Sequence, residues 1–568
     1  MKSILKFIPV LIVIFCSFYL YEIYNKNDLK SKLPALAAHS TLDTREAQKI
    51  NFSLNPNAVQ SQNISDTLSL QHKKPNIVII YPDQLRRYSA GYWSQDKFIQ
   101  DVIGKPDPVI TPNIDKLANN GVVLTKAVAN YPLCSPSRAM LLSGMYPEQN
   151  GVWNNARKDR NEDLNEDIIT ITNFFSEENY DIGYFGKAHY IKPEPMFNAS
   201  GDYVGTEKAP GGYFVNDYDT YIPPGIDRHD IDYYYHVLKD DHKNPFVYSN
   251  DPQVVGGQKD GEVFQPKEFS TKVESEVIID YLKNNRQQRK ESNPFFIFWS
   301  INPPHNPWDD ENTDMVEYHK YYDTDHYPKL DSSLVVRKNA DPEVADYVRN
   351  YFANVTSIDK YIGKVIKQLE AMNALNNTLI IVTADHGEML GSHGLSGKNV
   401  LYSESTAVPF IAHWPKGLSP HKTGVLLGSQ DIFPTVASLV GVKNNLPKTI
   451  EGNDLSANIR NTSRLNDKHG GVLLLLGNSR GLLTEDYTLV LQEDKKPWEK
   501  EKQTSLEKSI IFDHEEDPYQ LREIPLKERP KLANKLLKKL AVKLKISNDP
   551  WFQDKTHSEV IPYHKIEH

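Results

Sequence analysis

The chain has 568 residues, of which 39% are apolar and 24% are charged, enough apolar material for a sizeable core. This composition excludes a collagen-like protein, a coiled coil and a polytopic membrane protein. The 74 Asp and Glu residues outnumber the 65 Lys and Arg residues, so the formal net charge is −9. Because a global basic field is absent, no nucleic-acid partner is expected, and an anionic substrate would need a local basic pocket.

The first predicted element is an apolar run over residues 7–21 that follows Lys2 and Lys6. A positive segment followed by an apolar one is typical of an export signal. We expect either a cleaved signal peptide or an uncleaved anchor over residues 1–24. Both place the rest of the protein outside the cytoplasm, in the periplasm, at the cell surface or secreted. In the anchored case, residues 7–21 are the membrane tether.

The next segment, residues 25–72, has no steady hydrophobic period and predicts a tether or surface arm. A catalytic domain is expected over residues 73–470. Short apolar runs predict strands buried on both faces at residues 76–81, 182–185, 295–301 and 379–383. Helical patterns lie between them, most clearly over residues 111–121 and 347–369. The alternation predicts an α/β fold with a large, mostly parallel sheet flanked by helices.

Two segments depart from this alternation. An insertion over about residues 191–262 is rich in Tyr, including Tyr213, Tyr218, Tyr221 and the run Tyr233-Tyr-Tyr-His236. Its aromatic rings could stack on sugars or simply pack on the surface. After residue 470, apparent strands at residues 487–491 and 509–512 and a basic amphipathic helix over residues 530–544 predict a smaller α+β subdomain, residues 471–568.

Polar side chains follow two of the predicted strands. Asp83 and Gln84 follow the first strand, and Asp385 and His386 follow the strand that ends at Thr383. Ligands of open α/β sheets bind beyond the carboxyl ends of the strands, so the two Asp residues could form a hard-cation site with Gln84 and His386 as neutral donors. Taken alone, an Asp at a strand end is more often a helix cap or a turn former.

The strongest local signal surrounds Cys134, which stands two residues before Pro136 in a segment that ends at Gly144. Pro136 can open a helix, so Cys134 would face unpaired backbone N–H groups and the positive end of the helix dipole. Arg138, one turn along, can reach back to the same point. A group built on Cys134 would therefore meet an anion, although a capped helix with a chance cysteine is the simpler interpretation of this segment alone. Cys16 is the only other cysteine, so no disulfide framework is expected.

The segment Cys134-Ser-Pro-Ser-Arg138 resembles the Cys-x-Pro-x-Arg signature of type I sulfatases. Further segments resemble other motifs of that family and follow one another in the expected order. They are residues 75–84, 111–118, 139–147, 186–189, 303–307, 383–394 with Lys398, and 512–518. Such a set is far more specific than one motif. The resemblance, which is to bacterial polysaccharide sulfatases in particular, implies an alkaline-phosphatase-like fold and hydrolysis of sulfate esters.

The resemblance also implies how residue 134 would work. Cys134 would be oxidised to formylglycine before folding by a formylglycine-generating (sulfatase-maturating) enzyme. The hydrated aldehyde would attack sulfur with one oxygen and expel sulfate when the other is deprotonated. One divalent cation would activate this diol. Its implied ligands are Asp83, Gln84, Cys134 as formylglycine, Asp385 and His386. Ca²⁺ is the family expectation and Mg²⁺ the alternative, because His is an unusual ligand for Ca²⁺.

Five further residues receive roles from the same resemblance. Arg138 and Lys187 would stabilise the formylglycine oxygens and the metal cluster, and His189 would accept the diol proton. His305 and Lys398 would contact the sulfate, and either could protonate the leaving alcohol. Without the motifs, His305 would be a turn residue and both lysines would be solvated surface residues.

We therefore predict an exported, metal-dependent sulfatase that acts on a sulfated polysaccharide or oligosaccharide. One alternative is a phosphodiester or phosphonate monoester hydrolase with the same centre. Gln84 leaves room for it, because many sulfatases have Asp there and some phosphonate and phosphodiester hydrolases have Gln. The other alternative is a non-catalytic protein that binds sulfated glycans with an unconverted Cys134. The complete set of polar motifs argues against it.

Overall fold

The computed structural model describes residues 74–157, 160, 162–192, 219–238, 241–323, 325, 345–461, 470–494 and 505–565. Residues Lys73–His568 form the larger of the two units into which the chain divides. The predicted export segment and arm, residues 1–24 and 25–72, lie outside the described residues. Among the helices of the described part, none has the length and apolar character needed to span a bilayer.

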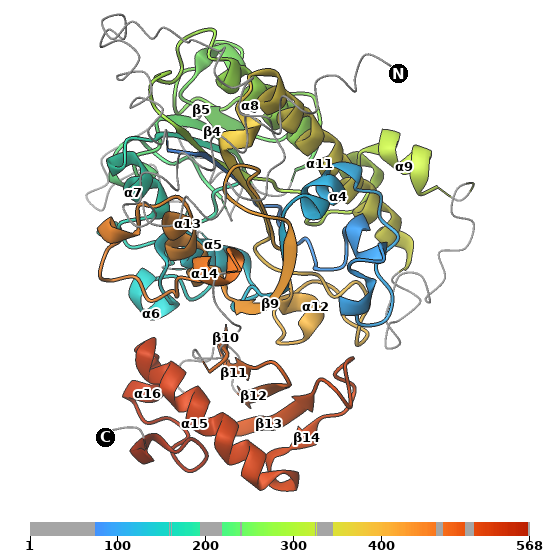
Figure 1. The fold of residues 1–568 in the computed structure, drawn as a ribbon, viewed down its shortest axis with the longest axis vertical. Coiled ribbons are helices and arrows are strands. Elements are labelled where there is room, and N and C mark those ends of the chain that lie inside the picture. Colours follow the sequence, from blue (N-terminus) through green and yellow to red (C-terminus); the bar gives the residue numbers. More distant parts are fainter. Residues whose placement is uncertain are drawn as a thin grey trace, which may run out of the picture. The chain divides into compact units, whose positions relative to one another are not determined.

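A nine-stranded sheet forms the centre of the larger unit (Figure 1). Its order is β5-β4-β3-β6-β1-β7-β8-β2-β9, and all strands except β5 and β8 run in one direction. The strands are β1 (Asn76–Ile80), β2 (Val122–Ala127), β3 (Asp181–Gly186), β4 (Tyr233–Val237), β5 (Val247–Ser249), β6 (Phe295–Ser300), β7 (Thr378–Val382), β8 (Ile411–His413) and β9 (His421–Leu427). The predicted mostly parallel sheet is confirmed, and the four predicted strands are β1, β3, β6 and β7.

Helices cover both faces of the sheet, which is why its strands are continuously apolar. Alternate residues of β1 enter two different cores: Ile77 and Ile79 enter one, and Val78 and Ile80 enter the other. The first core also holds α5 (Cys134–Ser143), α7 (Ile171–Glu177) and α13 (Ile432–Leu439). The second core also holds α4 (Pro112–Asn119), α8 (Ser270–Lys283) and the later turns of α11 (Ala345–Ala371). The helices α4 and α11 confirm the two clearest helical patterns of the sequence.

The Tyr-rich insertion contributes to the core of the sheet. Its residues 193–218, with Tyr213 and Tyr218, and 239–240 lie outside the described residues, but β4 and β5 extend one edge of the nine-stranded sheet. Tyr221 and the three Tyr residues at positions 233–235 are at most 7% exposed. Both expectations for these four rings, stacking on sugars and packing on the surface, are therefore wrong. Within β4, Tyr234 enters the first core and Tyr233 and Tyr235 enter the second, as expected of a strand that is covered on both faces.

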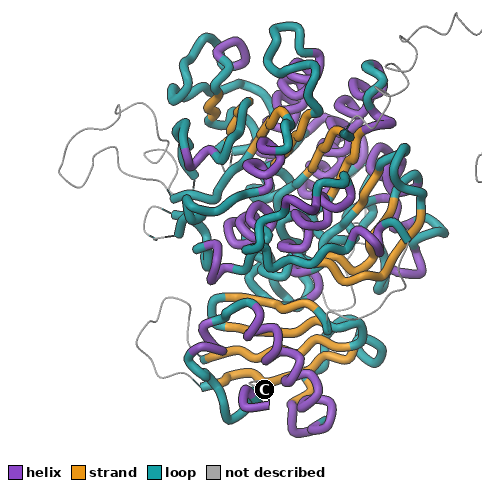
Figure 2. The backbone as a smooth tube through the Cα atoms, turned by 60° about the vertical axis from the view of Figure 1, so that its left-hand side comes forward, coloured by secondary structure: helices purple, strands orange, loops and turns teal. Residues whose placement is uncertain are grey.

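The C-terminal region forms a second, antiparallel sheet, drawn in red in Figure 1 and visible as stacked strands in Figure 2. Its strands are β10 (Val472–Leu476), β11 (Ser479–Leu483), β12 (Tyr487–Glu493), β13 (Leu506–Asp513) and β14 (Ile524–Pro525). The amphipathic helix α15 (Pro530–Ile546) packs its leucines against this sheet. Further α-helices among the described residues are the short α6 (Pro147–Asn150), α9 (Met315–Tyr321), α12 (Ser403–Thr406), α14 (Ser456–Ile459) and α16 (Pro550–Gln553). The five-stranded sheet with α15 packed against it confirms the predicted smaller α+β subdomain.

A buried carboxyl group in α8 makes stability depend on pH. Glu274 is fully buried, accepts a 2.7 Å hydrogen bond from the Trp299 indole, and has its pKa raised by burial to about 8. The carboxyl group of a Glu in an unfolded chain has a pKa of about 4.3. Between these two pH values, unfolding releases a proton, so stability falls as pH rises, with a slope of at most about 1.4 kcal/mol per pH unit.

We predict that Glu274→Gln flattens the decrease in the free energy of unfolding between about pH 5 and pH 8. Denaturant unfolding at several pH values measures this slope. Glu276→Gln, which changes an exposed residue of the same helix, is the matched control and should keep the wild-type slope. Equal slopes in wild type and Glu274→Gln would contradict the prediction.

Candidate active site

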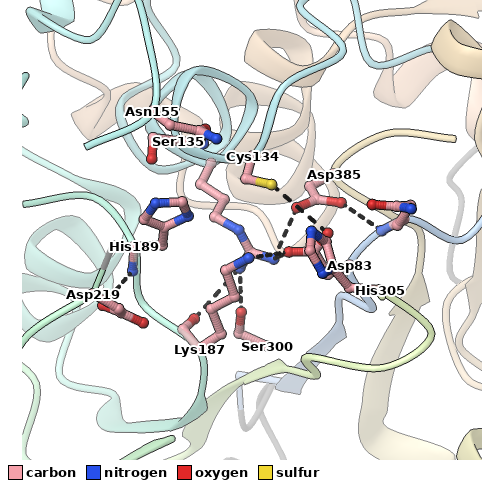
Figure 3. A network of polar contacts seen from close by, with 12 residues as sticks. Asp83, Cys134, Ser135, Asn155, Lys187, His189, Asp219, Ser300, His305 and Asp385 are labelled. Carbon is pink, nitrogen blue, oxygen red and sulfur yellow. Dashed lines mark hydrogen bonds and ion pairs between the residues drawn. The ribbon is translucent and has the colours of Figure 1, made fainter. Parts of the chain in front are cut away.

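The candidate residues meet at the carboxyl edge of four adjacent strands, β3, β6, β1 and β7 (Figure 3). Asp83 follows β1, Lys187 follows β3, and Asp385 follows β7, while Ser300 is the last residue of β6. Because parallel strands bring their carboxyl ends to one edge, residues up to 302 positions apart in the sequence become neighbours here. All four side chains are fully buried.

Cys134 is the first residue of α5 and is fully buried. The preceding Leu133 is extended, and Gly144 ends the helix in the left-handed conformation, as the sequence predicts. The Cys134 Sγ lies 3.3 Å from His386 Nε2 and 3.8 Å from Asp83 Oδ1. Burial raises the pKa of the thiol, but Lys187, Lys398 and His386 outweigh it and hold the pKa well below its ordinary value. The groups around residue 134 therefore stabilise a negative charge on its side chain.

Four buried residues could hold a metal ion. The ligand atoms of Asp83, Cys134, Asp385 and His386 all lie within 4.8 Å of one another. Two carboxylates and an imidazole, with an oxygen in place of the Cys134 sulfur, form a donor set that suits a hard divalent cation. The nearest approach of His386 Nε2 to Asp83 is 3.5 Å, and to Asp385 it is 3.7 Å.

Arg138 compensates the charge of the two carboxylates. Its Nη2 donates to Asp83 Oδ2 at 3.1 Å and to Asp385 Oδ2 at 2.9 Å, while its Nη1 donates to Ser300 Oγ. Lys187 also donates to Asp83 Oδ2. The two cations thus occupy one oxygen of Asp83 and leave Oδ1 facing Cys134 and the metal cluster. The orientation fits the predicted ligand set.

The two carboxylates differ in their electrostatics. Burial and Cys134 oppose ionisation of Asp83, but Lys187, His305 and Arg138 hold its pKa far below the ordinary value. Burial raises the pKa of Asp385 to about 6, and the charge of Asp83 acts in the same direction. Two neighbouring carboxylates cannot both ionise freely without added positive charge.

A glycine allows the chain to turn into the site after β3. Gly186 has φ +94°, and a Cβ atom there would lie 2.0 Å from the Ser300 carbonyl oxygen. That same oxygen accepts the backbone N–H of Lys187 at 2.7 Å. Only glycine fits this conformation and this close approach, which turn Lys187 and His189 into the site.

His189 is fully buried and interacts electrostatically with Cys134. Its Nε2 lies 3.1 Å from the Ala156 carbonyl oxygen, and since a carbonyl only accepts, Nε2 carries the proton. Its Nδ1 has no hydrogen-bond partner among the described residues. Burial lowers the pKa of His189, and its interaction with Cys134 only partly opposes this effect. The ring is therefore a neutral base.

His305 and Lys398 contact each other on another side of Cys134. The His305 Nδ1 lies 2.6 Å from the Asn306 carbonyl oxygen and donates to it, so Nε2 accepts the 2.9 Å bond from Lys398 Nζ. Burial and Lys398 lower the pKa of His305 to about 3. Lys398 also donates to Gln84 Oε1 at 2.5 Å.

Gln84 has a different neighbourhood from the other proposed ligands. Its backbone N–H donates to Asp385 Oδ1 at 2.9 Å, and its side-chain Nε2 donates to Glu388 Oε2 at 2.5 Å. Together with the Lys398 contact, these bonds place the amide between Lys398 and Glu388. Gln84 thus borders the four-residue cluster and links it to Lys398.

The structure brings together the ten residues named from the sequence: Asp83, Gln84, Cys134, Arg138, Lys187, His189, His305, Asp385, His386 and Lys398. Sequence reasoning missed Ser300, Glu388 and Asp219. Ser300 could have been found, since it ends a predicted strand at the same edge. Asp219 lies in the Tyr-rich insertion, where no local pattern marks it.

Comparison with known proteins gives concordant results. The sequence model of the family described as Sulfatase matches residues 75–442. The chain is 36% identical to an Endo-4-O-sulfatase of Bacteroides thetaiotaomicron, over 87% of this chain and 96% of that protein. It is 28% identical to an Ulvan-active sulfatase of Formosa agariphila, over 83% of this chain and 81% of that protein.

A solved structure from a study of the metabolism of multiple glycosaminoglycans by Bacteroides thetaiotaomicron is similar throughout. It has a TM-score of 0.77 and 34% identity to this chain, and the match covers 86% of this chain and all of that one. The family match, the identity to curated relatives and the shared fold show that this chain belongs to the sulfatase family and is a sulfuric ester hydrolase.

Proposed function

We propose that this chain is an exported, metal-dependent sulfatase that removes sulfate from a polysaccharide or oligosaccharide, with residue 134 as a formylglycine nucleophile. The observation that carries the proposal is the environment of Cys134 at the start of α5. Its side chain touches Asp83 and His386, and three positive groups outweigh burial in lowering its pKa. Such a site favours charge on a hydroxyl group at position 134.

Conversion of Cys134 would have to precede folding, because its side chain has no exposed surface in the folded chain. A maturating enzyme is therefore the expected partner. The hydrated aldehyde would supply two hydroxyl groups. One oxygen would bond to sulfur as the bond from sulfur to the alcohol oxygen breaks. Loss of the second hydroxyl proton would then break the bond to sulfate and restore the aldehyde.

Asp83, Asp385, His386 and residue 134 would hold one divalent cation, with Ca²⁺ as our first expectation and Mg²⁺ as the alternative. The Oδ1 of Asp83 faces this cluster, and Arg138 and Lys187 fix the other oxygen. When bound, the cation would lower the pKa of the hydroxyl nucleophile and neutralise sulfate oxygens. Gln84 Oε1 accepts one bond from Lys398, and its second lone pair could join the set.

Three cations surround the position that the sulfate would take: Arg138, Lys187 and Lys398. Arg138 is committed to the two carboxylates, whereas Lys187 and Lys398 both act on residue 134 electrostatically. His189, a neutral base with its lone pair free, would accept the hydroxyl proton during sulfate release.

The geometry supports Lys398 as the proton donor to the leaving alcohol. The neutral His305 ring donates its single N–H, at Nδ1, to the Asn306 carbonyl oxygen. Its Nε2 accepts a hydrogen bond from Lys398. The Lys398 ammonium has three N–H groups and donates two of them, to His305 and to Gln84. We propose that the third reaches the bridging oxygen and that His305 positions Lys398.

For the substrate, we propose a 4-O-sulfated carbohydrate, from which the sulfate is removed at a sugar inside the carbohydrate chain. The support is the 36% identity to a protein named Endo-4-O-sulfatase, which spans 96% of that relative. Export is proposed from the basic and apolar N-terminal sequence, residues 1–24. A sulfated polysaccharide is too large to enter a cell freely, which is consistent with a site of action outside it.

The first prediction here concerns residue 134. Protein made with a maturating enzyme should contain formylglycine in the tryptic peptide that includes position 134, and Cys134→Ala should abolish sulfate release. Peptide mass spectrometry and a sulfate assay measure both. Ser143→Ala, at the other end of α5, is the control and should retain turnover. Full activity in protein whose peptide contains only cysteine would contradict the prediction.

The second prediction concerns the metal. Active protein should carry one divalent ion per chain by elemental analysis, and Asp385→Asn should lose it together with roughly 10²-fold or more of the activity. Asp549→Asn, which alters a buried carboxylate paired with Arg480 elsewhere, should keep the ion. Re-addition of Ca²⁺ or Mg²⁺ after chelation distinguishes the two cations. Activity without a bound divalent ion would refute this site.

The third prediction separates Lys398 from His305. Sugar alcohols are poorer leaving groups than phenols, so loss of the acid should lower kcat/KM for a 4-O-sulfated oligosaccharide by about 10² to 10⁴ and affect nitrophenyl sulfate much less. Lys398→Ala should show this pattern, and His305→Ala a weaker form of it. Equal losses on both substrates with Lys398→Ala would instead indicate that Lys398 binds the sulfate.

Faster turnover of an aryl phosphonate than of the aryl sulfate would contradict the substrate class.

A further inference from the structure

The Tyr-rich insertion delivers two buried polar residues to the back of His189. Asp219 is 1% exposed, and His236, the fourth residue of β4, has no exposed surface. β4 pairs with β3 so that His236 lies beside Gly186, at the point where the chain turns into the site. The insertion thus reaches the carboxyl edge of the sheet next to the catalytic residues.

Asp219 joins His236 to His189 through its two oxygens, and Figure 3 shows its bond to His189. Its Oδ1 accepts the backbone N–H of His189 at 3.3 Å and that of Thr220 at 3.0 Å. Its Oδ2 lies 3.2 Å from His236 Nε2. Although burial raises the pKa of Asp219, His236 outweighs it and lowers the pKa to about 2, so the carboxyl group is ionised.

His189 needs such support because its backbone is in the left-handed region, with φ +51°. This conformation is disfavoured for a non-glycine residue and persists only where neighbouring groups fix it. Asp219 fixes the backbone, and the Ala156 carbonyl fixes the ring. The two anchors together fix the His189 ring, which interacts with Cys134 and whose Nδ1 has no partner among the described residues.

We propose that Asp219 and His236 form a positioning pair that holds His189 in the geometry for accepting the proton in the sulfate-release step. The pair touches neither substrate nor residue 134, so it acts through His189. This inference rests on the proton-acceptor role of His189 in the proposed function. The carboxylate charge would also stabilise the imidazolium that forms when His189 takes the proton.

The test begins with Asp219→Ala and Asp219→Asn. Ala removes both acceptors, and Asn has a single acceptor oxygen, so it cannot serve both the His189 N–H and a His236 donor. We expect Ala to lower kcat for sulfate release by about 10²-fold and Asn to lower it less. In both variants KM should fall in parallel with kcat, so that kcat/KM is unchanged, because only the step after alcohol release is slowed. Asp232→Asn is the matched control, since Asp232 accepts the Ile182 N–H at the opposite end of β3 and should leave kcat unchanged.

The affected step can be identified with nitrophenyl sulfate. Alcohol release precedes sulfate release, so Asp219→Ala should give a burst of nitrophenol followed by a slow steady state. In a His189→Ala background, Asp219→Ala should cause no further loss, because both changes remove the same function. Additive losses, or a loss of nitrophenol release without a burst, would overturn the inference.

A crystal structure of the Asp219 variants gives a readout that is independent of activity. The His189 ring should leave the Ala156 carbonyl in Asp219→Ala, or in Asp219→Asn if the Ala variant does not fold. It should stay in place in Asp232→Asn. An unmoved His189 in the Asp219 variants would overturn the inference. Absence of sulfate release from every ester by the wild-type protein would instead refute the proposed function, and the crystal structures would still decide the positioning role.

Discussion

The buried guanidinium of Arg138 between Asp83 and Asp385 is the interaction on which the rest of the site depends. Two carboxylates from adjacent strand ends repel each other in a region without bulk water. Arg138 contacts both, and breaking such a buried set by removing one partner typically costs about 3–5 kcal/mol. Since Arg138 lies one turn into α5, its pairing also fixes the helix that carries Cys134.

The loops at this edge of the sheet follow from that constraint. Lys187 must approach Asp83 from β3, and Gly186 makes the necessary turn because a side chain there would collide with Ser300. Ser300 then accepts from Arg138 through its hydroxyl group and from Lys187 through its carbonyl oxygen. One strand end thus orients both cations, and Asp83 Oδ1 is left facing residue 134.

Much of this arrangement could be predicted from the sequence, because it follows periodic or local patterns. Strands covered on both faces produce continuous apolar runs, and polar residues at their ends mark one edge of a parallel sheet. Asp219 and the Ala156 carbonyl could not be found in this way. The first acts through its spatial position behind His189, and the second is a backbone group that any residue type would supply. The burial of the Tyr run of β4 could not be predicted either, because it depends on which distant segments cover that part of the sheet.

The proton chemistry of the site is set by two backbone carbonyls. Ala156 holds the proton of His189 on Nε2, and Asn306 holds that of His305 on Nδ1, so the two imidazoles are neutral and have opposite tautomers. Each ring therefore has one unprotonated nitrogen, Nδ1 in His189 and Nε2 in His305, and the latter accepts from Lys398. With both imidazoles neutral, the Lys398 ammonium is the donor that we propose for the leaving alcohol. The proposed base follows β3, whereas the proposed acid follows β7, so the two come from different segments of the chain.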